Sequence, residues 1–284
     1  MPVFGLVGDP VDFSLSPPLY RHLFPRLGMT ASYQAFSVPV SQLEVWLLEA
    51  HHRGIGLLHV TAPHKRRVAR LMDELTPEAR RAGAVNVVCS RGGKLVGHLT
   101  DGLGLVASLR EGGWEQAEGG GVIFGTGGTA AAVASALAQV GVPHVHLVYR
   151  RGSSLDPLLA HLREFHPHTS FSAAELETPL TRGHLGGADL IIDTRPPTAH
   201  IPCFSPQVLP SLRPGVTLCD VNYRPPYSPF VCQVVAEVPR VLDGIGMFIH
   251  QAALSLEWYL GQWVDPRQVK ACLPEGVRFH RAVS

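Results

Sequence analysis

The sequence predicts an α/β protein of two domains, each built on a mostly parallel sheet. In the first part of the chain, short apolar runs alternate with amphipathic stretches of roughly 10 to 15 residues, the pattern of successive βαβ units. Near Glu111 the chain becomes rich in glycine, and beyond it the alternation of strand and helix patterns resumes. A chain of 284 residues is long enough for two domains at about 150 residues per domain.

Each expected element follows from its own stretch of sequence. Apolar and β-branched runs bounded by turn residues predict strands in the first part at 3–7, 33–38, 57–61 and 84–89. Amphipathic stretches predict helices between them at 17–27, 40–52 and 64–71. In the second part, we expect strands at 121–124, 144–149, 190–193 and 217–220, and helices at 131–140 and from 243 to 258.

The composition excludes several classes of protein. Basic and acidic residues are balanced at 24 and 23, so the chain lacks the basic excess typical of proteins that bind nucleic acid. An apolar content of 45% argues against disorder. Five widely spaced cysteines without a C-x-x-C pair indicate a reducing, cytoplasmic location and no structural metal. We expect no membrane span, because no apolar run reaches about 18 residues, and the N-terminus lacks the basic region of a signal peptide.

A glycine turn follows the strand expected at 121–124. Its sequence is Gly125-Thr126-Gly127-Gly128-Thr129-Ala130. In a Rossmann unit, two glycines allow the tight turn and the approach of a pyrophosphate, and a small third residue packs the helix on the strand. Phosphate charge then lies on the free N–H groups at the start of the helix. The strand, turn, helix and strand in succession therefore predict a dinucleotide site, although a plain glycine-rich connection gives the same pattern.

The end of the next strand indicates which dinucleotide binds. An Asp or Glu there would hold the ribose hydroxyl of NAD, but this chain has Tyr149, Arg150 and Arg151, and its first acid is Asp156. Guanidinium groups suit a phosphate through charge-assisted, bidentate contacts. The sequence therefore favours NADP over NAD, the alternative being a solvated pair of surface arginines.

Lysine is rare in this chain, which has 3 lysines against 21 arginines. A lysine, unlike an arginine, can release a proton near neutral pH. Lys65 directly follows a predicted strand and begins a predicted helix, so it is the candidate for such chemistry. Lys94 falls in an expected hairpin turn and Lys270 in a polar helix near the C-terminus, and both are typical of surface residues.

Five short motifs occur in a definite order along the chain. They are Ser14-Leu15-Ser16-Pro17, Val60-Thr61-Ala62-Pro63-His64-Lys65, Gly83-Ala84-Val85-Asn86, Thr100-Asp101-Gly102-Leu103-Gly104 and Gly246-Met247-Phe248-Ile249-His250-Gln251. Together with the glycine turn, this ordered set resembles the shikimate dehydrogenase family over nearly the full length. The resemblance implies a substrate-binding and catalytic domain at 1–104 plus 240–284, and a Rossmann-type NADP-binding domain at 105–239.

The resemblance also implies a reaction and a set of site residues. The reaction is the reversible NADPH-dependent reduction of 3-dehydroshikimate to shikimate, with Lys65 and Asp101 as the catalytic pair. The substrate-binding residues it implies are Ser14, Ser16 and Tyr223 for a carboxylate, and Thr61, Asn86, Asp101 and Gln251 for ring hydroxyls. The cofactor-binding residues it implies are Gly125, Thr126, Gly127, Gly128, Thr129, Tyr149, Arg150, Arg151, Val221 and Gly244.

The chemistry agrees with the role of Lys65. Reducing a ketone builds negative charge on oxygen, and a cation that can donate a proton stabilises that charge and completes the alcohol. Structural alternatives exist for the other residues. The two serines can cap the helix that begins near Pro17, Asp101 can be a helix N-cap, and Gln251 can be an ordinary helix residue.

Several positions depart from the family pattern. His59, Val87 and Leu99 stand where the family usually has Asn, Thr and Asn, and 193–195 reads Asp-Thr-Arg in place of Asn-Ala-Thr. Such changes leave open a different substrate, such as quinate or another shikimate analogue, or a non-catalytic protein that senses a ligand or nucleotide. A dehydrogenase of an unrelated small acid is disfavoured by the first and last motifs. The sequence leaves open a monomer or a homodimer.

His59 supports a separate hypothesis. A neutral imidazole at this position can replace one hydrogen bond of an amide. Protonation of His59 below about pH 6 would then alter substrate affinity.

Overall fold

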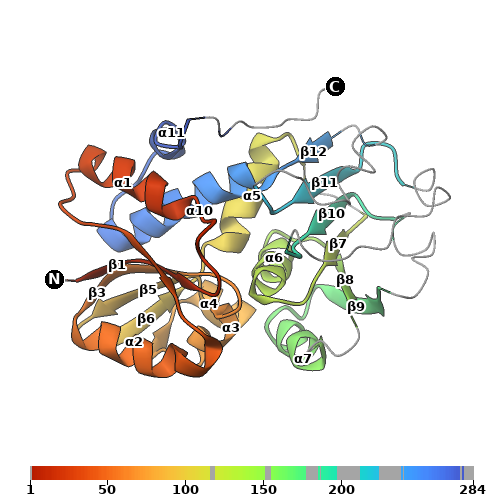
Figure 1. The fold of residues 1–284 in the computed structure, drawn as a ribbon. Coiled ribbons are helices and arrows are strands. Elements are labelled where there is room, and N and C mark those ends of the chain that lie inside the picture. The colour runs from red at the N-terminus through yellow and green to blue at the C-terminus, as the bar shows by residue number, and fades with distance from the viewer. Residues whose placement is uncertain are drawn as a thin grey trace.

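The computed structural model describes residues 2–115, 119–150, 155–176, 185, 187–196, 212–223, 238, 240–275 and 277. Two six-stranded sheets lie side by side, each with helices packed on it (Figure 1). Of the described helices, none is both long and apolar enough to span a membrane.

The first sheet is mixed. Its strands are β1 (Val3–Gly8), β2 (Gln34–Ser37), β3 (Ile55–Val60), β4 (Glu74–Leu75), β5 (Val87–Arg91) and β6 (Lys94–His98), in the order β2-β1-β3-β5-β6-β4. β1 pairs in parallel with β2 and β3, and β4 with β6, whereas β5 is antiparallel to β3 and β6. β5 and β6 form a hairpin because Gly92 and Gly93 adopt φ of 57° and 78°, which allows the tight turn. Lys94 therefore lies at a hairpin, as predicted.

Helices cover both faces of this sheet. They are α1 (Ser16–Arg26), α2 (Leu43–His52) after a 3-10 turn at Val40–Gln42, α3 (Lys65–Ala69) and α4 (Pro77–Ala82). α2 covers one face, and α1 covers the opposite face together with α10 (Gly244–Leu260) (Figure 1). All six residues of β3 are buried, as expected for a central strand enclosed on both faces.

The second sheet is parallel throughout. Its strands are β7 (Gly121–Phe124), β8 (His144–Tyr149), β9 (Ser170–Glu175), β10 (Leu190–Asp193), β11 (Thr217–Asp220) and β12 (Arg240–Leu242), in the order β12-β11-β10-β7-β8-β9. α6 (Gly128–Gln139) and α7 (Leu155–Phe165) connect its first strands. The strand order reverses between β7 and β10, which is the point where doubly wound sheets bind nucleotides at the carboxyl ends of their strands.

α5 (Asp101–Glu111) lies between the two halves and packs against both α6 and α10. Two glycines allow these close contacts. A Cβ on Gly102 would strike the carbonyl oxygen of Ala132 in α6, and a Cβ on Gly104 would lie 2.7 Å from the backbone nitrogen of Gln251 in α10. Two glycines of the motif at 100–104 therefore have a packing role in the fold.

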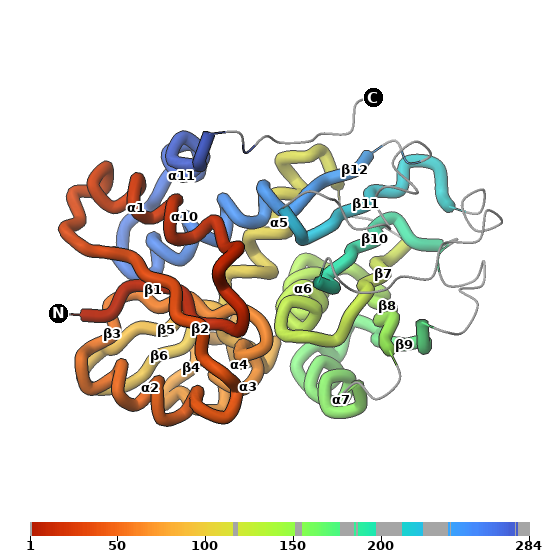
Figure 2. The backbone as a smooth tube through the Cα atoms, in the orientation of Figure 1, coloured from red at the N-terminus to blue at the C-terminus, as the bar shows by residue number. Residues whose placement is uncertain are grey.

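The chain returns to the first sheet after completing the second. α10 and α11 (Pro266–Lys270) lie beside α1, as the blue and red parts of the trace show in Figure 2. One hydrophobic cluster joins Tyr20 of α1, Leu57 of β3 and Phe248 of α10. The N- and C-terminal parts of the chain thus share one core.

Candidate active site

Lys65 and Asp101 form a nearly buried ion pair. The Lys65 Nζ lies 2.6 Å from Asp101 Oδ2, and the two side chains are 11% and 7% exposed. Lys65 is the first residue of α3 and Asp101 the first residue of α5. The Lys65 Nζ also donates a hydrogen bond to the Thr129 Oγ1 at 2.9 Å. The ammonium therefore links the first sheet to α6 of the second.

Asp101 is not the N-cap of its helix. Thr100 occupies that position, and the Asp101 carboxylate accepts hydrogen bonds from Lys65 and from the Asn86 Nδ2. A carboxylate in the first turn also interacts favourably with the helix dipole. These two hydrogen bonds fix the position of the Asp101 carboxylate at the start of α5.

The Asn86 amide connects three other residues. Its Nδ2 lies within hydrogen-bonding distance of Asp101 Oδ1 at 2.8 Å, Thr100 Oγ1 at 3.0 Å and Gln251 Oε1 at 3.4 Å. Its Oδ1 accepts from the Thr100 backbone nitrogen at 2.8 Å. Asn86 is buried, and Gln251 reaches it from α10. The structure therefore brings together Lys65, Asp101, Asn86 and Gln251 from four separate motifs.

The remaining predicted substrate residues lie at the ends of neighbouring elements. Ser14 Oγ accepts a hydrogen bond from the Ser16 backbone nitrogen at 3.1 Å, but the N-cap of α1 is Leu15 and no side chain caps the helix, so the capping alternative for the two serines is wrong. Thr61 follows β3, and its backbone nitrogen donates to the Val7 carbonyl at 2.9 Å. The Tyr223 ring lies 5.0 Å from that of Phe248 in α10.

The glycine turn has the expected local structure. Gly125 adopts φ of 115°, and Ala130 is buried in the core as the small packing residue. A Cβ on Gly127 would meet no atom within 4 Å, so the backbone there is open to a ligand. A Cβ on Gly128, by contrast, would lie 2.5 Å from the Lys65 Cβ. Gly128 is thus needed for the approach of Lys65, which the sequence did not reveal.

The other predicted cofactor residues lie along the same sheet edge. Tyr149 ends β8 and Arg150 follows it, Arg150 is exposed, and Arg151 lies outside the described residues. Gly244 begins α10, and a Cβ there would strike the Val221 carbonyl. Val221 and Gly244 are therefore in direct contact.

A buried ion pair beside the glycine turn was missed from the sequence. Arg195 Nε and Nη2 donate to the Asp193 carboxylate at 2.8 and 2.9 Å, and the two side chains are 7% and 1% exposed. The guanidinium lies 4.7 Å from the Phe124 ring centroid. Arg195 Nη1 is buried and has no hydrogen-bond partner among the described residues. The sequence signal that could have indicated this pair was the departure of residues 193–195 from the family pattern.

These features fit a bound dinucleotide. The open backbone at Gly127 and the start of α6 are suited to phosphate. The Arg195 Nη1 offers a buried donor close to Gly125, whose added Cβ would lie 3.6 Å from the Arg195 Cγ. All of these groups lie at the carboxyl ends of β7 and β10, where the strand order reverses.

The proposed titration of His59 near pH 6 is wrong. Burial lowers the pKa of His59 from 6.5 to about 3. Its Nε2 lies 3.0 Å from the Tyr20 hydroxyl and its Nδ1 lies 2.9 Å from the Tyr33 hydroxyl. His59 therefore stays neutral over the range in which its protonation was expected to matter.

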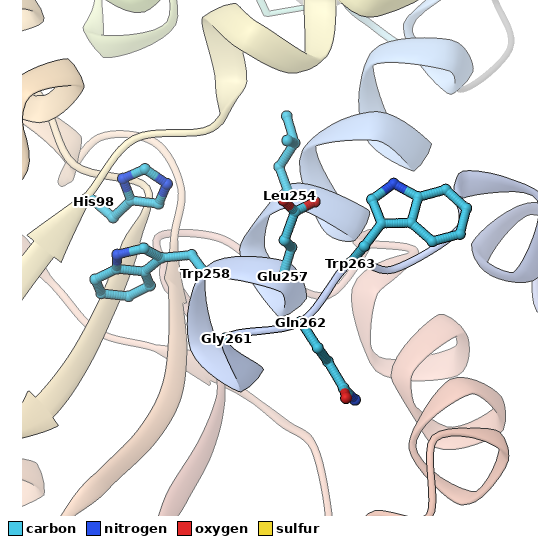
Figure 3. Close-up of a pocket in the computed structure, with 7 residues that line it drawn as sticks. All are labelled: His98, Leu254, Glu257, Trp258, Gly261, Gln262 and Trp263. Atoms are coloured by element: carbon cyan, nitrogen blue, oxygen red, sulfur yellow. The ribbon is translucent and has the colours of Figure 1, made fainter.

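A separate surface pocket lies at the C-terminal end of α10 (Figure 3). Trp258 and Trp263 line it together with His98 and Glu257. The His98 ring stacks on Trp258 with ring centroids 4.8 Å apart, and its Nδ1 lies 2.9 Å from the Thr76 hydroxyl. None of the predicted site residues lines this pocket, so it is distinct from the cluster around Lys65.

The doubly wound second sheet, its glycine turn and the adjoining lysine–aspartate pair define a two-sheet α/β oxidoreductase that uses a dinucleotide. Residues 6–88 match the family model described as the shikimate dehydrogenase substrate binding domain. The chain is 35% identical over 280 residues to the shikimate dehydrogenase (NADP(+)) of Geobacillus kaustophilus, covering 97% of this chain and 99% of that protein. The chain belongs to the shikimate dehydrogenase family.

Solved structures show the same fold. The shikimate 5-dehydrogenase of Thermus thermophilus, in complex with NADP(H) and shikimate, matches with a TM-score of 0.77 and 28% identity over 96% of this chain and 98% of that one. The ligand-free 5-ketofructose reductase of Gluconobacter sp. strain CHM43 matches with a TM-score of 0.78 and 28% identity, over 95% and 97% of the two chains.

Arg195→Ala should destabilise the fold by about 3–5 kcal/mol, because it leaves the Asp193 carboxylate buried without its guanidinium. The double variant Asp193→Ala/Arg195→Ala should be less destabilised than the sum of the two single variants. Urea unfolding of the four proteins measures both effects. An Arg195→Ala protein as stable as the unaltered one would show that the pair does not compensate a buried charge.

His59 should make stability depend on acidity. Its pKa is about 3 in the fold and 6.5 when exposed, so the unfolded chain takes up the proton first, and the free energy of unfolding falls as the pH drops from 6.5 towards 3. His59→Asn removes this contribution. The stability advantage of the unaltered protein over the variant should therefore narrow below pH 6.5, as measured by urea unfolding across pH. If the free energies of unfolding of the two proteins changed with pH in parallel, this would contradict the burial of a neutral imidazole.

Proposed function

We propose that the chain catalyses the reversible NADPH-dependent reduction of 3-dehydroshikimate to shikimate, with Lys65 and Asp101 as the catalytic pair. The observation that carries this proposal is the Lys65 ammonium, held by Asp101 on one side and Thr129 on the other, where the two sheets meet. The names of the Geobacillus kaustophilus relative and of the ligands in the Thermus thermophilus structure support the same reaction.

Lys65 acts as the proton donor to the ketone oxygen. An ammonium has three N–H donors, and Asp101 and Thr129 accept two of them, so the third is available to the substrate. NADPH, when bound, supplies the hydride to the carbonyl carbon. As charge develops on the oxygen, Lys65 stabilises it and transfers a proton to it, and in the reverse direction Lys65 accepts that proton. Asp101 fixes the direction of the ammonium.

Two sets of side chains hold the substrate. Ser14, Ser16 and Tyr223 bind its carboxylate, whereas Thr61, Asn86, Asp101 and Gln251 bind its ring hydroxyls. The hydrogen bonds from Asn86 to Asp101 and Gln251 support this second set, because they fix the amide and carboxylate orientations before substrate binds.

The carboxyl edge of the second sheet would hold the cofactor. The turn from Gly125 to Thr129 would hold its pyrophosphate, and Tyr149, Arg150 and Arg151 would hold the adenosine phosphate. Val221 and Gly244 complete the site, and Arg195 Nη1 adds a donor beside the turn.

We place the substrate-binding domain at 1–104 plus 240–284 and the cofactor domain at 105–239. The protein acts in the cytoplasm as a monomer or homodimer, without a nucleic-acid partner.

A second candidate is a paralogue that reduces a related cyclic ketone, such as dehydroquinate. The Gluconobacter reductase has the same fold and is named for a different substrate. Val87 and Leu99, which replace polar family residues, are buried in the hydrophobic core. At these two positions the chain therefore has apolar packing in place of polar side chains. Initial rates with shikimate and quinate, each with NADP⁺ and NAD⁺, distinguish the two candidates.

Lys65→Ala should lower kcat by about 10²–10⁴-fold, because it removes the proton donor, and Lys65→Arg should restore little. Steady-state rates with shikimate and NADP⁺ measure this. Lys94→Ala is the matched control, because Lys94 pairs with Glu74 on the surface and both side chains are more than half exposed. Near-normal kcat in Lys65→Ala would remove Lys65 from the chemistry.

Arg150→Ala should raise KM for NADP⁺ about 10-fold, because it removes a charge-assisted contact to phosphate, and should leave KM for NAD⁺ unchanged. Arg53→Ala, which changes an exposed arginine in the first half of the chain, is the control. Equal effects on the two cofactors would show that Arg150 is only a solvated surface residue.

A further inference from the structure

Lys65 and the glycine turn are in direct contact where the two sheets meet. Lys65 begins α3, and Thr129 is the second residue of α6, directly after the turn. The Lys65 Nζ lies 2.9 Å from the Thr129 Oγ1, and a Cβ on Gly128 would lie 2.5 Å from the Lys65 Cβ. Two contacts therefore hold the lysine against the segment that is suited to phosphate.

The direction of the hydrogen bond between Lys65 and Thr129 follows from the chemistry of the two groups. An ammonium has donors only, so the Thr129 oxygen accepts this hydrogen bond and keeps its own proton for another acceptor. The part of the chain that the structure describes offers no acceptor for that proton. Thr129 is only half-buried, and the backbone at nearby Gly127 is open. The Thr129 hydroxyl is therefore a donor that a ligand could use.

The start of α6 favours an anionic ligand. No side chain caps this helix, and its first hydrogen bond runs from the Ala131 nitrogen to the Gly127 carbonyl. The N–H groups of Gly128, Thr129 and Ala130 thus have no partner within the helix. Such groups, together with the positive end of the helix dipole, favour phosphate. Thr129 contributes both a backbone donor and a hydroxyl donor to this end of the helix.

Arg195 gives independent evidence of a ligand at the same place. Its Nη1 is buried and has no hydrogen-bond partner among the residues described, and its Cγ would lie 3.6 Å from a Cβ on Gly125. A buried donor without an acceptor destabilises a fold, so an acceptor supplied by a ligand would satisfy it. The turn therefore has unused donors on both of its sides.

We propose that the Thr129 hydroxyl couples the two halves of the site, accepting a hydrogen bond from Lys65 and donating one to a phosphate oxygen of the dinucleotide. The proposal rests on the proposed function, in which the turn holds the pyrophosphate and Lys65 meets the ketone oxygen. A hydroxyl that accepts from a cation is a stronger donor, so Lys65 strengthens cofactor binding through Thr129. Because coupling between two sites is reciprocal, bound cofactor also fixes the direction of the ammonium.

Dissociation constants for NADP⁺, measured by titration calorimetry without substrate, test this coupling apart from turnover. Thr129→Val keeps the branched shape but removes the hydroxyl, and it should weaken binding about 10-fold, whereas Thr129→Ser should restore it. Lys65→Ala should weaken binding about fivefold through the loss of the same hydrogen bond. In a Thr129→Val background, Lys65→Ala should have little further effect.

Rates test the effect of Thr129 on the lysine. At saturating NADP⁺, Thr129→Val should lower kcat for shikimate about 10-fold, because the ammonium loses one of the two contacts that fix its direction, and Thr129→Ser should restore kcat. Thr30→Val makes the same change at an exposed threonine in the first part of the chain and is the matched control. Lys94→Ala is the control for Lys65→Ala in both assays.

The two assays separate the possible failures. An unchanged dissociation constant in Thr129→Val would overturn the contact with phosphate. Additive effects of Thr129→Val and Lys65→Ala would show that the two side chains act separately, and would overturn the coupling. Equal effects in Thr30→Val and Lys94→Ala would overturn it as well. Absence of turnover with shikimate in the unaltered protein would refute the proposed function, while the dissociation constants would still decide whether Thr129 couples Lys65 to the cofactor.

Discussion

The buried contact between Lys65 and Asp101 constrains most of the structure around it. Removing two charges from water is costly, and the cost is offset only by close geometry and additional hydrogen bonds. Thr129 and Asn86 supply those bonds, and the start of α5 adds a favourable dipole. Gly128 carries no side chain because Lys65 occupies that space. A residue of the phosphate turn is thus also part of the environment of the ion pair.

α5 transmits this constraint to the rest of the molecule. It contacts α6 through Gly102 and α10 through Gly104, and both contacts are too close for any side chain at the glycine. As a result, Asp101 is held next to Lys65 and α6, while Gln251 of α10 reaches the Asn86 amide. The site is therefore assembled from packed helices and strand ends, which are more rigid supports than loops.

The sequence predicted the elements whose signals are local. The strands at 144–149, 190–193 and 217–220 are confirmed with the same bounds, because each is a β-branched apolar run enclosed by turn residues. β4, β9, β12, α4 and α7 were not predicted, and β9 (SFSAAE) has Phe171 as its single large apolar residue. The motifs identified Lys65, Asp101, Asn86 and Gln251, which the structure brings together. The Asp193–Arg195 pair and the neutral His59 depend on burial and on partners distant in sequence, such as Tyr20, so no local pattern could reveal them.

The return of α10 to the first sheet affects how the protein is made. Phe248 and Leu256 cover Tyr20 and Leu57, yet α10 follows all strands of the second sheet in the chain. While the ribosome synthesises residues 121–242, the apolar face beneath α1 lacks its cover and remains exposed to water and to other nascent chains. Contacts of such long sequence separation form slowly. The N-terminal half can therefore complete its core only after α10 has been synthesised.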